Sequence, residues 1–86
     1  MLNNNEYICR ICGLIQDEPT WEDDNPSYNL CPCCGVEFGY EDTTLASIRN
    51  YRNKWANSGY KWVELNIKPQ NWNLDEQLKN IPASYL

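Results

Sequence analysis

The 86-residue sequence contains no histidine, and that absence removes several kinds of chemistry. Histidine is the commonest general base at neutral pH and the commonest partner of cysteine in mixed metal sites. A serine or cysteine nucleophile would therefore lack its usual base. The sequence also has no glycine-rich loop of the kind that cradles phosphates. We expect a protein that is not an enzyme.

Long apolar runs are missing as well. No stretch is long enough to cross a membrane, and the chain opens Met-Leu-Asn-Asn-Asn-Glu, without the apolar segment of a secretory signal. We therefore expect a cytoplasmic protein with reduced thiols and no membrane partner. The five cysteines are an odd number, which also disfavours a closed disulfide framework.

Positive charge is scarce in the first half of the chain. Residues 1–42 contain nine acidic residues and one basic residue, whereas residues 43–86 contain six basic and three acidic residues. A surface this acidic repels phosphate backbones, so we do not expect a nucleic acid partner. The acidic residues either simply keep the chain soluble or favour a basic protein partner.

What the sequence does contain is a pair of similar cysteine turns. The first knuckle is Cys9-Arg10-Ile11-Cys12-Gly13, and the second knuckle is Cys31-Pro32-Cys33-Cys34-Gly35. A Cys-x-x-Cys turn aims two sulfurs at one point, and two such turns make a tetrahedral four-sulfur site suited to Zn²⁺ or a single iron. Closed four-cysteine zinc sites are usually structural, and metal binding then supplies folding free energy.

The second knuckle leaves the choice of ligands open, because Cys33 lies between the two cysteines of the pair. The spacing that matches the first knuckle, with Gly35 following, favours Cys31 and Cys34. Cys33 would then be a spare thiol, either a small residue accommodated in the turn or a redox-sensitive one. The acidic surroundings oppose reactivity, since they raise the pKa of a thiol.

Short hairpins are predicted around both knuckles, with Tyr7-Ile8 pairing with Leu14-Ile15 around the first. Around the second, residues 28–30 lead in and residues 36–40 lead out as a half-exposed strand. Between the knuckles, residues 17–27 form a predicted acidic loop with Trp21 as its one large anchor.

A helix is predicted at about residues 43–57, with Asp42 or Thr43 as its N-cap and Gly59 as its stop. Its stripe at three- and four-residue steps comprises Leu45, Ile48, Tyr51, Arg52 and Trp55. Residues 60–65 are expected to be extended, and Asn73 is predicted to cap a short helix at 74–80. The aromatic residues of the second half are expected to pack the helix onto the knuckles; they are Tyr51, Trp55, Trp62 and Trp72.

The knuckle residues resemble those of known families. The tyrosine two residues before Cys9 and the proline after Cys31 are similar to the metal knuckles of rubredoxin and of rubredoxin-like zinc ribbons. That resemblance implies the metal ligands Cys9, Cys12, Cys31 and Cys34. Rubredoxins differ in having a longer segment between the knuckles and no helical second half. The run from Cys31 to Tyr40 resembles the cysteine-rich, CPCC-type small bacterial proteins, which implies a fold and a metal but little about function.

These observations predict a single domain over residues 1–86, a small α+β metal-bound domain. A rubredoxin-like zinc ribbon with short β-hairpins (residues 6–41) is followed by a helical C-terminal extension (residues 43–86), which holds one α-helix and a short C-terminal helix. The expected function is that of a non-catalytic protein with a structural zinc, acting as a protein–protein interaction module. An immunity or antitoxin-like protein that neutralises a basic enzyme is one version. The alternative is a rubredoxin-like iron protein in single-electron transfer.

Overall fold

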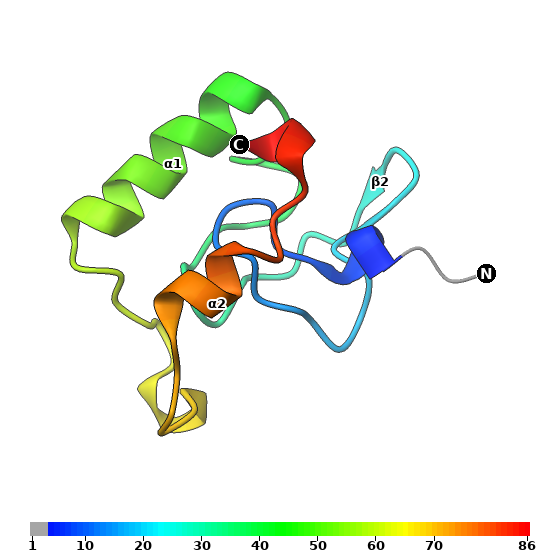
Figure 1. Ribbon diagram of the computed structural model, residues 1–86. Coiled ribbons are helices and arrows are strands. Elements are labelled where there is room, and N and C mark those ends of the chain that lie inside the picture. The colour runs from blue at the N-terminus through cyan, green and yellow to red at the C-terminus, as the bar shows by residue number, and fades with distance from the viewer. Residues whose placement is uncertain (1–3) are drawn as a thin grey trace.

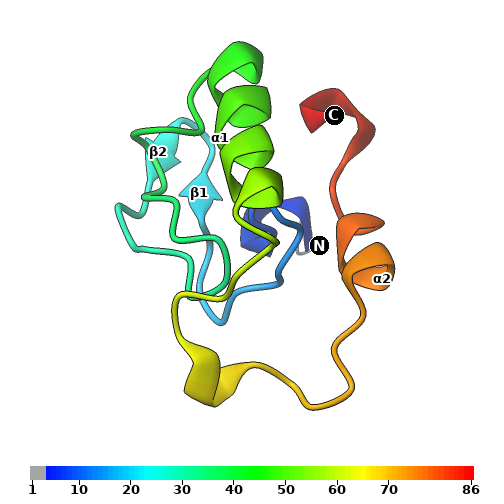
Figure 2. The same cartoon turned by 90° about the vertical axis from the view of Figure 1, so that its left-hand side faces the viewer.

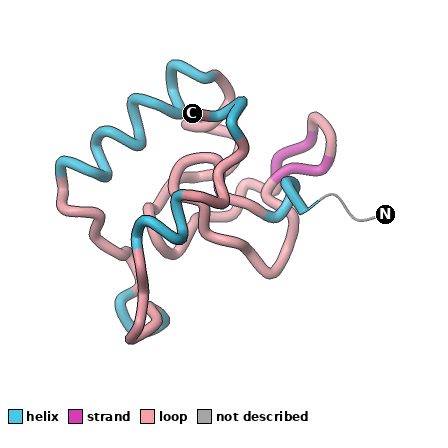
Figure 3. The backbone as a smooth tube through the Cα atoms, in the orientation of Figure 1, coloured by secondary structure: helices cyan, strands magenta, loops and turns pink. Residues whose placement is uncertain are grey.

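Loops and turns connect short helices and one small hairpin along the chain (Figures 1 and 3). A computed structural model describes residues 4–86. The elements in chain order are η1 (Asn4–Tyr7), β1 (Trp21–Glu22), β2 (Asn25–Pro26), α1 (Leu45–Asn57), η2 (Leu65–Ile67), α2 (Leu74–Leu78) and η3 (Ala83–Tyr85), where η marks a 3₁₀-helix. This arrangement agrees with the α+β class expected from the sequence.

The two knuckles have the same backbone hydrogen bonds. In each, the N–H of the first cysteine donates to the carbonyl five residues later, and the N–H of the glycine donates back to the carbonyl of that cysteine. The four bonds are Cys9–Leu14, Gly13–Cys9, Cys31–Val36 and Gly35–Cys31, and each is 2.9 Å long. Gly13 and Gly35 have φ of +84° and +85°, a region that suits glycine because it has no Cβ. The two turns are therefore structural repeats of each other.

The predicted hairpins around the knuckles are reduced to single antiparallel bridges, Ile8 with Ile15 and Leu30 with Glu37. The strands predicted here are therefore wrong in length. Around the first knuckle, η1 ends at Tyr7 and the chain bends at Asp17, so too few extended residues remain to form a ladder of hydrogen bonds. The stretch after the second knuckle is not a strand either, because residues 38–40 form a turn. Val36 and Phe38 are buried, as the alternation predicted, but Tyr40 is 74% exposed.

The acidic segment between the knuckles contains the one strand pair of the described residues, which the sequence did not predict. β1 pairs antiparallel with β2, with Trp21 opposite Pro26 and Glu22 opposite Asn25. Asp23 in the turn has a φ of +54°, a backbone conformation that aspartate tolerates better than most residues. The expected role of Trp21 as an anchor is confirmed, since its indole N–H donates to the Asp42 carboxylate at 2.9 Å.

Helix α1 begins two residues later than predicted, and its N-cap is Thr44. The Thr44 hydroxyl accepts from the Ser47 N–H at 3.1 Å. Asp42 is not the cap because its fully buried carboxylate already accepts from the Gly39 N–H at 2.7 Å and from Trp21. Gly59 follows the helix with φ of +91°, as predicted.

One face of α1 packs on the knuckles. Ile48 and Trp55 are buried, and Tyr51 and Arg52 are partly buried, as the helical spacing predicted. Leu45 is 39% exposed, so its expected place on the buried stripe was wrong. Leu45 is the first residue of the helix, directly after the N-cap.

The chain after α1 is held on the second knuckle without forming a strand. The N–H groups of Val63 and Glu64 donate to the Cys33 and Pro32 carbonyls, both at 3.0 Å. The predicted extended segment is therefore replaced by a bent connection into η2. Helix α2 ends at Leu78 rather than Asn80, and its predicted cap is confirmed, because Asn73 Oδ1 accepts from the Glu76 N–H at 3.0 Å.

The chain then returns to its first half. In Figure 2, α1 stands between the β-hairpin on the left and α2 with the C-terminal segment on the right. The side chain of Gln77 in α2 donates to the Cys12 carbonyl at 3.1 Å, and Asn80 donates to the Gly13 carbonyl at 3.1 Å. The end of the chain reaches α1, where Arg49 donates to the Leu86 carbonyl at 2.8 Å.

Substitution of Gly13 by alanine is expected to destabilise the fold strongly. A Cβ at this position would overlap the backbone carbonyl oxygen of Gln77, in addition to the strain of an alanine at φ of +84°. We expect the free energy of unfolding to fall by about 3 kcal/mol or more. Chemical denaturation with metal present would measure this change.

Gly59→Ala is the matched control for that substitution. Gly59 has a similar φ of +91°, but nothing lies within 4 Å of the position that a Cβ would take. Its substitution should cost only the backbone strain, about 1 to 2 kcal/mol. Equal losses for the two variants would mean that the contact between the first knuckle and α2 is not tight.

Candidate metal centre

Four cysteine side chains from the two knuckles meet in the core. The sulfur atoms of Cys9, Cys12, Cys31 and Cys34 all lie within 4.8 Å of one another. Their side chains are between 0% and 7% exposed. The structure therefore brings together the four residues that the sequence singled out, in an arrangement that could hold a metal ion.

The closest sulfur pairs join the two knuckles. Cys9 Sγ lies 3.6 Å from Cys34 Sγ, and Cys12 Sγ lies 3.7 Å from Cys31 Sγ. A tetrahedral zinc site with Zn–S bonds of about 2.3 Å has S···S edges of about 3.8 Å. A disulfide would need about 2.05 Å, and all five cysteines are free thiols. The spacing fits a shared metal ion and does not fit disulfides.

The chemistry of the cluster also fits a cation. Burial raises the pKa of the Cys12 and Cys34 thiols. The pKa of Cys31 is lowered, first because the Cys12 thiol donates to it and then because those of Cys34 and Cys9 do. Burial therefore disfavours the thiolate at Cys12 and Cys34. A divalent cation bound among the sulfurs would favour thiolates at all four positions.

Side chains from outside the knuckles donate to two sulfur atoms of the second knuckle, one of them in the cluster. Gln16 Nε2 donates to Cys31 Sγ at 3.6 Å, and Gln77 Nε2 donates to Cys33 Sγ at 3.5 Å. Such donors stabilise negative charge on sulfur and orient the groups around a metal. Neither glutamine was predicted from the sequence as part of the site. Gln77 could have been found, because it lies three residues after Leu74 and four before Ile81, on the apolar face of α2.

The Arg52 side chain of α1 clamps the first knuckle. Its Nε donates to the Ile11 carbonyl at 2.7 Å, and its Nη2 donates to the Arg10 carbonyl at 2.8 Å and to the Tyr85 carbonyl at 2.7 Å. The pKa of Arg52 is lowered, mainly because the side chain is partly buried. The nearby cysteines Cys9, Cys12 and Cys34 oppose this shift. A guanidinium retains its charge in proteins, so Arg52 places a cation beside a cluster that would carry excess negative charge with Zn²⁺ bound.

Arg10 links the first knuckle to other segments of the chain. Its guanidinium lies 4.2 Å from the ring centroid of Trp21 and 4.6 Å from that of Tyr85. Arg10 Nη1 also donates to the Asp42 carbonyl at 3.2 Å. The single base of the acidic half thus connects the β-hairpin, the first knuckle and the C-terminal segment.

Cys33 is fully buried and lies outside the group of four. The repeat of the two knuckles explains its position, because Cys33 corresponds to Ile11, which is also fully buried. Cys33 therefore fills an apolar position of the turn, and its sulfur accepts from Gln77. The hydrogen bond from Cys12 lowers the pKa of Cys33, with a smaller contribution from Gln77. The interpretation as a small residue accommodated in the turn agrees with this position.

Cys33→Ser is expected to leave the metal content unchanged. The serine hydroxyl can still accept from Gln77, and the substitution costs about 1 kcal/mol for placing a hydroxyl in a buried site. Elemental analysis of the purified protein and a thermal unfolding curve would measure both effects. Loss of metal in this variant would place Cys33 among the ligands.

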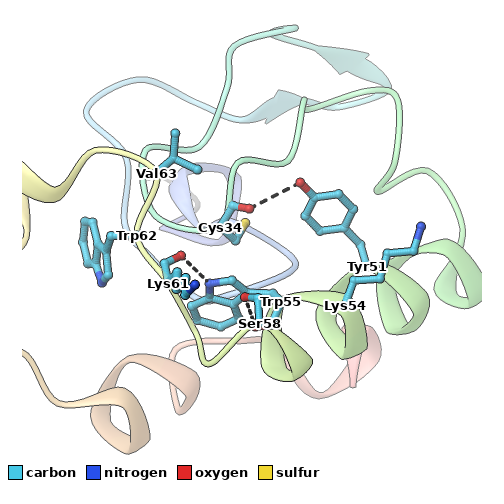
Figure 4. Close-up of a pocket in the computed structure, with 8 residues that line it drawn as sticks. All are labelled: Cys34, Tyr51, Lys54, Trp55, Ser58, Lys61, Trp62 and Val63. Carbon is cyan, nitrogen blue, oxygen red and sulfur yellow. Dashed lines mark hydrogen bonds between the residues drawn. The ribbon is translucent and has the colours of Figure 1, made fainter.

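A cavity of about 320 Å³ adjoins the second knuckle, between the end of α1 and the chain that follows it (Figure 4). The Tyr51 hydroxyl donates to the Cys34 carbonyl at 3.3 Å. Burial, with help from Glu41, raises the pKa of Tyr51 to about 12, so the hydroxyl remains protonated at neutral pH. Trp55 donates to the Lys61 carbonyl at 3.0 Å.

The aromatic residues expected in the core are there. Trp55 and Trp62 are buried, and Tyr51 and Trp72 pack against the core cluster partly exposed. Trp62 and Trp72 form an edge-to-face pair with centroids 5.7 Å apart. These rings cover the knuckles on the side of the second half of the chain.

The sequence matches no known protein-family profile, and no solved structure matches it. The chain is similar to a protein of Bacillus subtilis (strain 168) named "Uncharacterized protein YoaQ", with 36% identity over 70 residues. The aligned part covers 62% of this chain and 59% of that protein. The chain therefore spans less than two thirds of the length of this relative. The rubredoxin-like and CPCC-type resemblances remain predictions.

Among the described residues, the helices are too short or too polar to span a membrane.

Proposed function

We propose that Cys9, Cys12, Cys31 and Cys34 bind one zinc ion that is structural. The observation that carries this proposal is the burial of all four sulfurs in one cluster with cross-knuckle spacings of 3.6 and 3.7 Å. Zinc bound there would neutralise part of the thiolate charge and join the knuckles. A chain of 86 residues builds only a modest core, so the ion would replace part of what is missing.

A catalytic role has little support in this site. Catalytic zinc sites keep an open coordination position and usually three protein ligands, whereas this cluster offers four buried sulfurs. The sequence also lacks the histidine that would serve as a general base. We therefore propose that the protein is non-catalytic and that the metal ion stabilises it as a single folded unit.

The proposed activity is binding to another protein in the cytoplasm. Several large apolar side chains stand exposed on the surface, and the formal net charge is −5. Exposed apolar residues beside charged ones are typical of protein interaction sites. An immunity or antitoxin-like role against a basic enzyme is the concrete version of this proposal, and it rests on small size and acidity.

A rubredoxin-like iron site is the second candidate, because four thiolates in this geometry also suit iron. The colour of the protein distinguishes the two metals. Protein purified from cells supplied with both metals should be colourless and contain one zinc per chain. A red protein whose visible bands bleach on reduction would establish iron and single-electron transfer instead.

Chemical cross-linking in the source cells would test the interaction role. We expect a discrete complex with a second protein, which zinc chelation before cross-linking should abolish. If the zinc-loaded chain is recovered only without a partner under all growth conditions tried, the interaction role is wrong even when the zinc site is correct.

A further inference from the structure

A groove of about 460 Å³ runs along the side of the second knuckle, away from α1. The segment after the first knuckle forms one wall, and the chain around η2 (yellow in Figure 1) forms the other. Between them lie residues that lead into and through the second knuckle. The lining residues used below are Asp17, Glu18, Leu30, Pro32, Glu64 and Ile67.

The charged residues that line this groove are all acidic. Asp17 and Glu18 come from one wall and Glu64 from the other, and no lysine or arginine is among the lining residues. All three side chains belong to exposed residues, so the carboxylates face solvent beside the groove. Their charges add to one another there, which makes the groove attractive to cations.

The rest of the lining includes apolar residues that are open to a partner. Leu30 is 65% exposed and Ile67 is 50% exposed, although both are large aliphatic residues. Pro32, which is part of the second knuckle, also lines the groove. An exposed aliphatic pair within an acidic rim is unfavourable in water, and a partner that covers it gains the free energy of apolar burial.

The groove is fixed to the metal-binding part of the molecule. The N–H groups of Val63 and Glu64 donate to the Cys33 and Pro32 carbonyls at 3.0 Å, which fastens one wall to the second knuckle. On the other wall, Gln16 lines the groove and donates to Cys31 Sγ. Both walls are therefore held in place before a partner arrives, which lowers the entropy cost of binding.

We infer that this groove binds a basic segment of a partner protein, in which lysine or arginine stands beside an aliphatic or aromatic side chain. The basic group would approach Asp17, Glu18 and Glu64, while its apolar neighbour would cover Leu30 and Ile67. This inference rests on the proposed interaction role and adds to it the place and the chemistry of the contact. Charge complementarity selects this occupant over an acidic protein or a nucleic acid.

Selection from random-sequence displayed peptides on the immobilised, zinc-loaded full chain tests the inference. The recovered peptides should be enriched in lysine or arginine next to leucine, isoleucine or phenylalanine. Affinity of one synthesised winner, measured by fluorescence anisotropy, should weaken about tenfold between roughly 0.05 and 0.5 M salt. A consensus that is acidic or that lacks charge would overturn the inference.

Two pairs of variants locate the contact. The triple variant D17N/E18Q/E64Q should weaken binding of the winner about tenfold or more, whereas E22Q/D23N/D24N on the hairpin removes the same charge elsewhere and should change it less than about twofold. Ile67→Ser should weaken binding severalfold, whereas Leu65→Ser should not, because Leu65 lies in the same short helix, is 71% exposed and does not line the groove. Each variant must retain one zinc per chain.

The outcomes separate this inference from the broader proposal. If the peptides bind but the hairpin variant weakens them as much as the groove variant does, the groove is the wrong place and the interaction role stands. If cross-linking in cells yields a partner whose contact maps elsewhere, the inference is also wrong. If neither selection nor cross-linking yields any binder, both the groove and the interaction role are rejected.

Discussion

Cys12→Ser is expected to abolish metal binding and to unfold the region around both knuckles. Cys12 supplies a fully buried sulfur 3.7 Å from that of Cys31, so its loss opens the cluster of four. A structural zinc in a small domain contributes about 10 kcal/mol or more, which is comparable with the whole stability of a domain. Elemental analysis should find less than about one tenth of a zinc per chain, and amide NMR signals should collapse towards random-coil positions.

The control for that experiment is Cys33→Ser. It makes the same chemical change directly before Cys34 and two residues after Cys31, at a cysteine that lies outside the cluster. Treatment of the unaltered protein with a strong chelator should reproduce the Cys12→Ser spectrum, and added zinc should restore the folded one. A Cys12→Ser protein that holds one metal per chain and retains its dispersed spectrum would show that the assigned ligands are wrong.

Arg52→Ala is expected to lower the free energy of unfolding by about 3 kcal/mol. The side chain makes three hydrogen bonds of 2.7 to 2.8 Å to carbonyls of the first knuckle and of Tyr85. Each of these partly buried bonds to a charged donor contributes about 1 kcal/mol, and its loss leaves the carbonyl without this partner. Denaturant unfolding of the zinc-loaded protein measures the change.

Two further substitutions separate the effect of the Arg52 hydrogen bonds from the effect of its charge. Arg52→Lys retains the charge but cannot reproduce the fork of donors, so it should recover less than half of the lost stability. Lys54→Ala removes a positive charge from an exposed position of the same helix and should change stability by less than about 0.5 kcal/mol. An Arg52→Ala protein as stable as Lys54→Ala would mean that the clamp contributes nothing.

The candidate site could be predicted from the sequence because its pattern is local. Each Cys-x-x-Cys-Gly turn specifies its own geometry over five residues, and the cap at Asn73 likewise depends on neighbours in sequence. The sequence therefore predicted that the four cysteines lie close together, that α1 and α2 form, and that the aromatic residues pack in the core. It also predicted the burial of Ile48 and Trp55 from their helical spacing.

The errors arose where distant segments compete for the same groups. Asp42 was expected to cap α1, but its carboxylate is taken by Trp21 and Gly39, and only the tertiary structure shows this. The strands expected around the knuckles have too few partners to form ladders. Residues 60–65, which were expected to be extended, bend into η2 instead. Arg52 was assigned to the helix stripe, and its three carbonyl partners lie far away in sequence.

The repeated hydrogen bonds of the two knuckles have a consequence for the order of folding. Each turn closes a ring of a few residues, so it forms quickly and at small entropic cost. The sulfur contacts between the knuckles must close a much longer loop. In a chain stripped of metal, zinc would therefore need to order only one short turn to gain its first two thiolates, and the rate of refolding should increase with free zinc concentration until closure of that long loop becomes limiting.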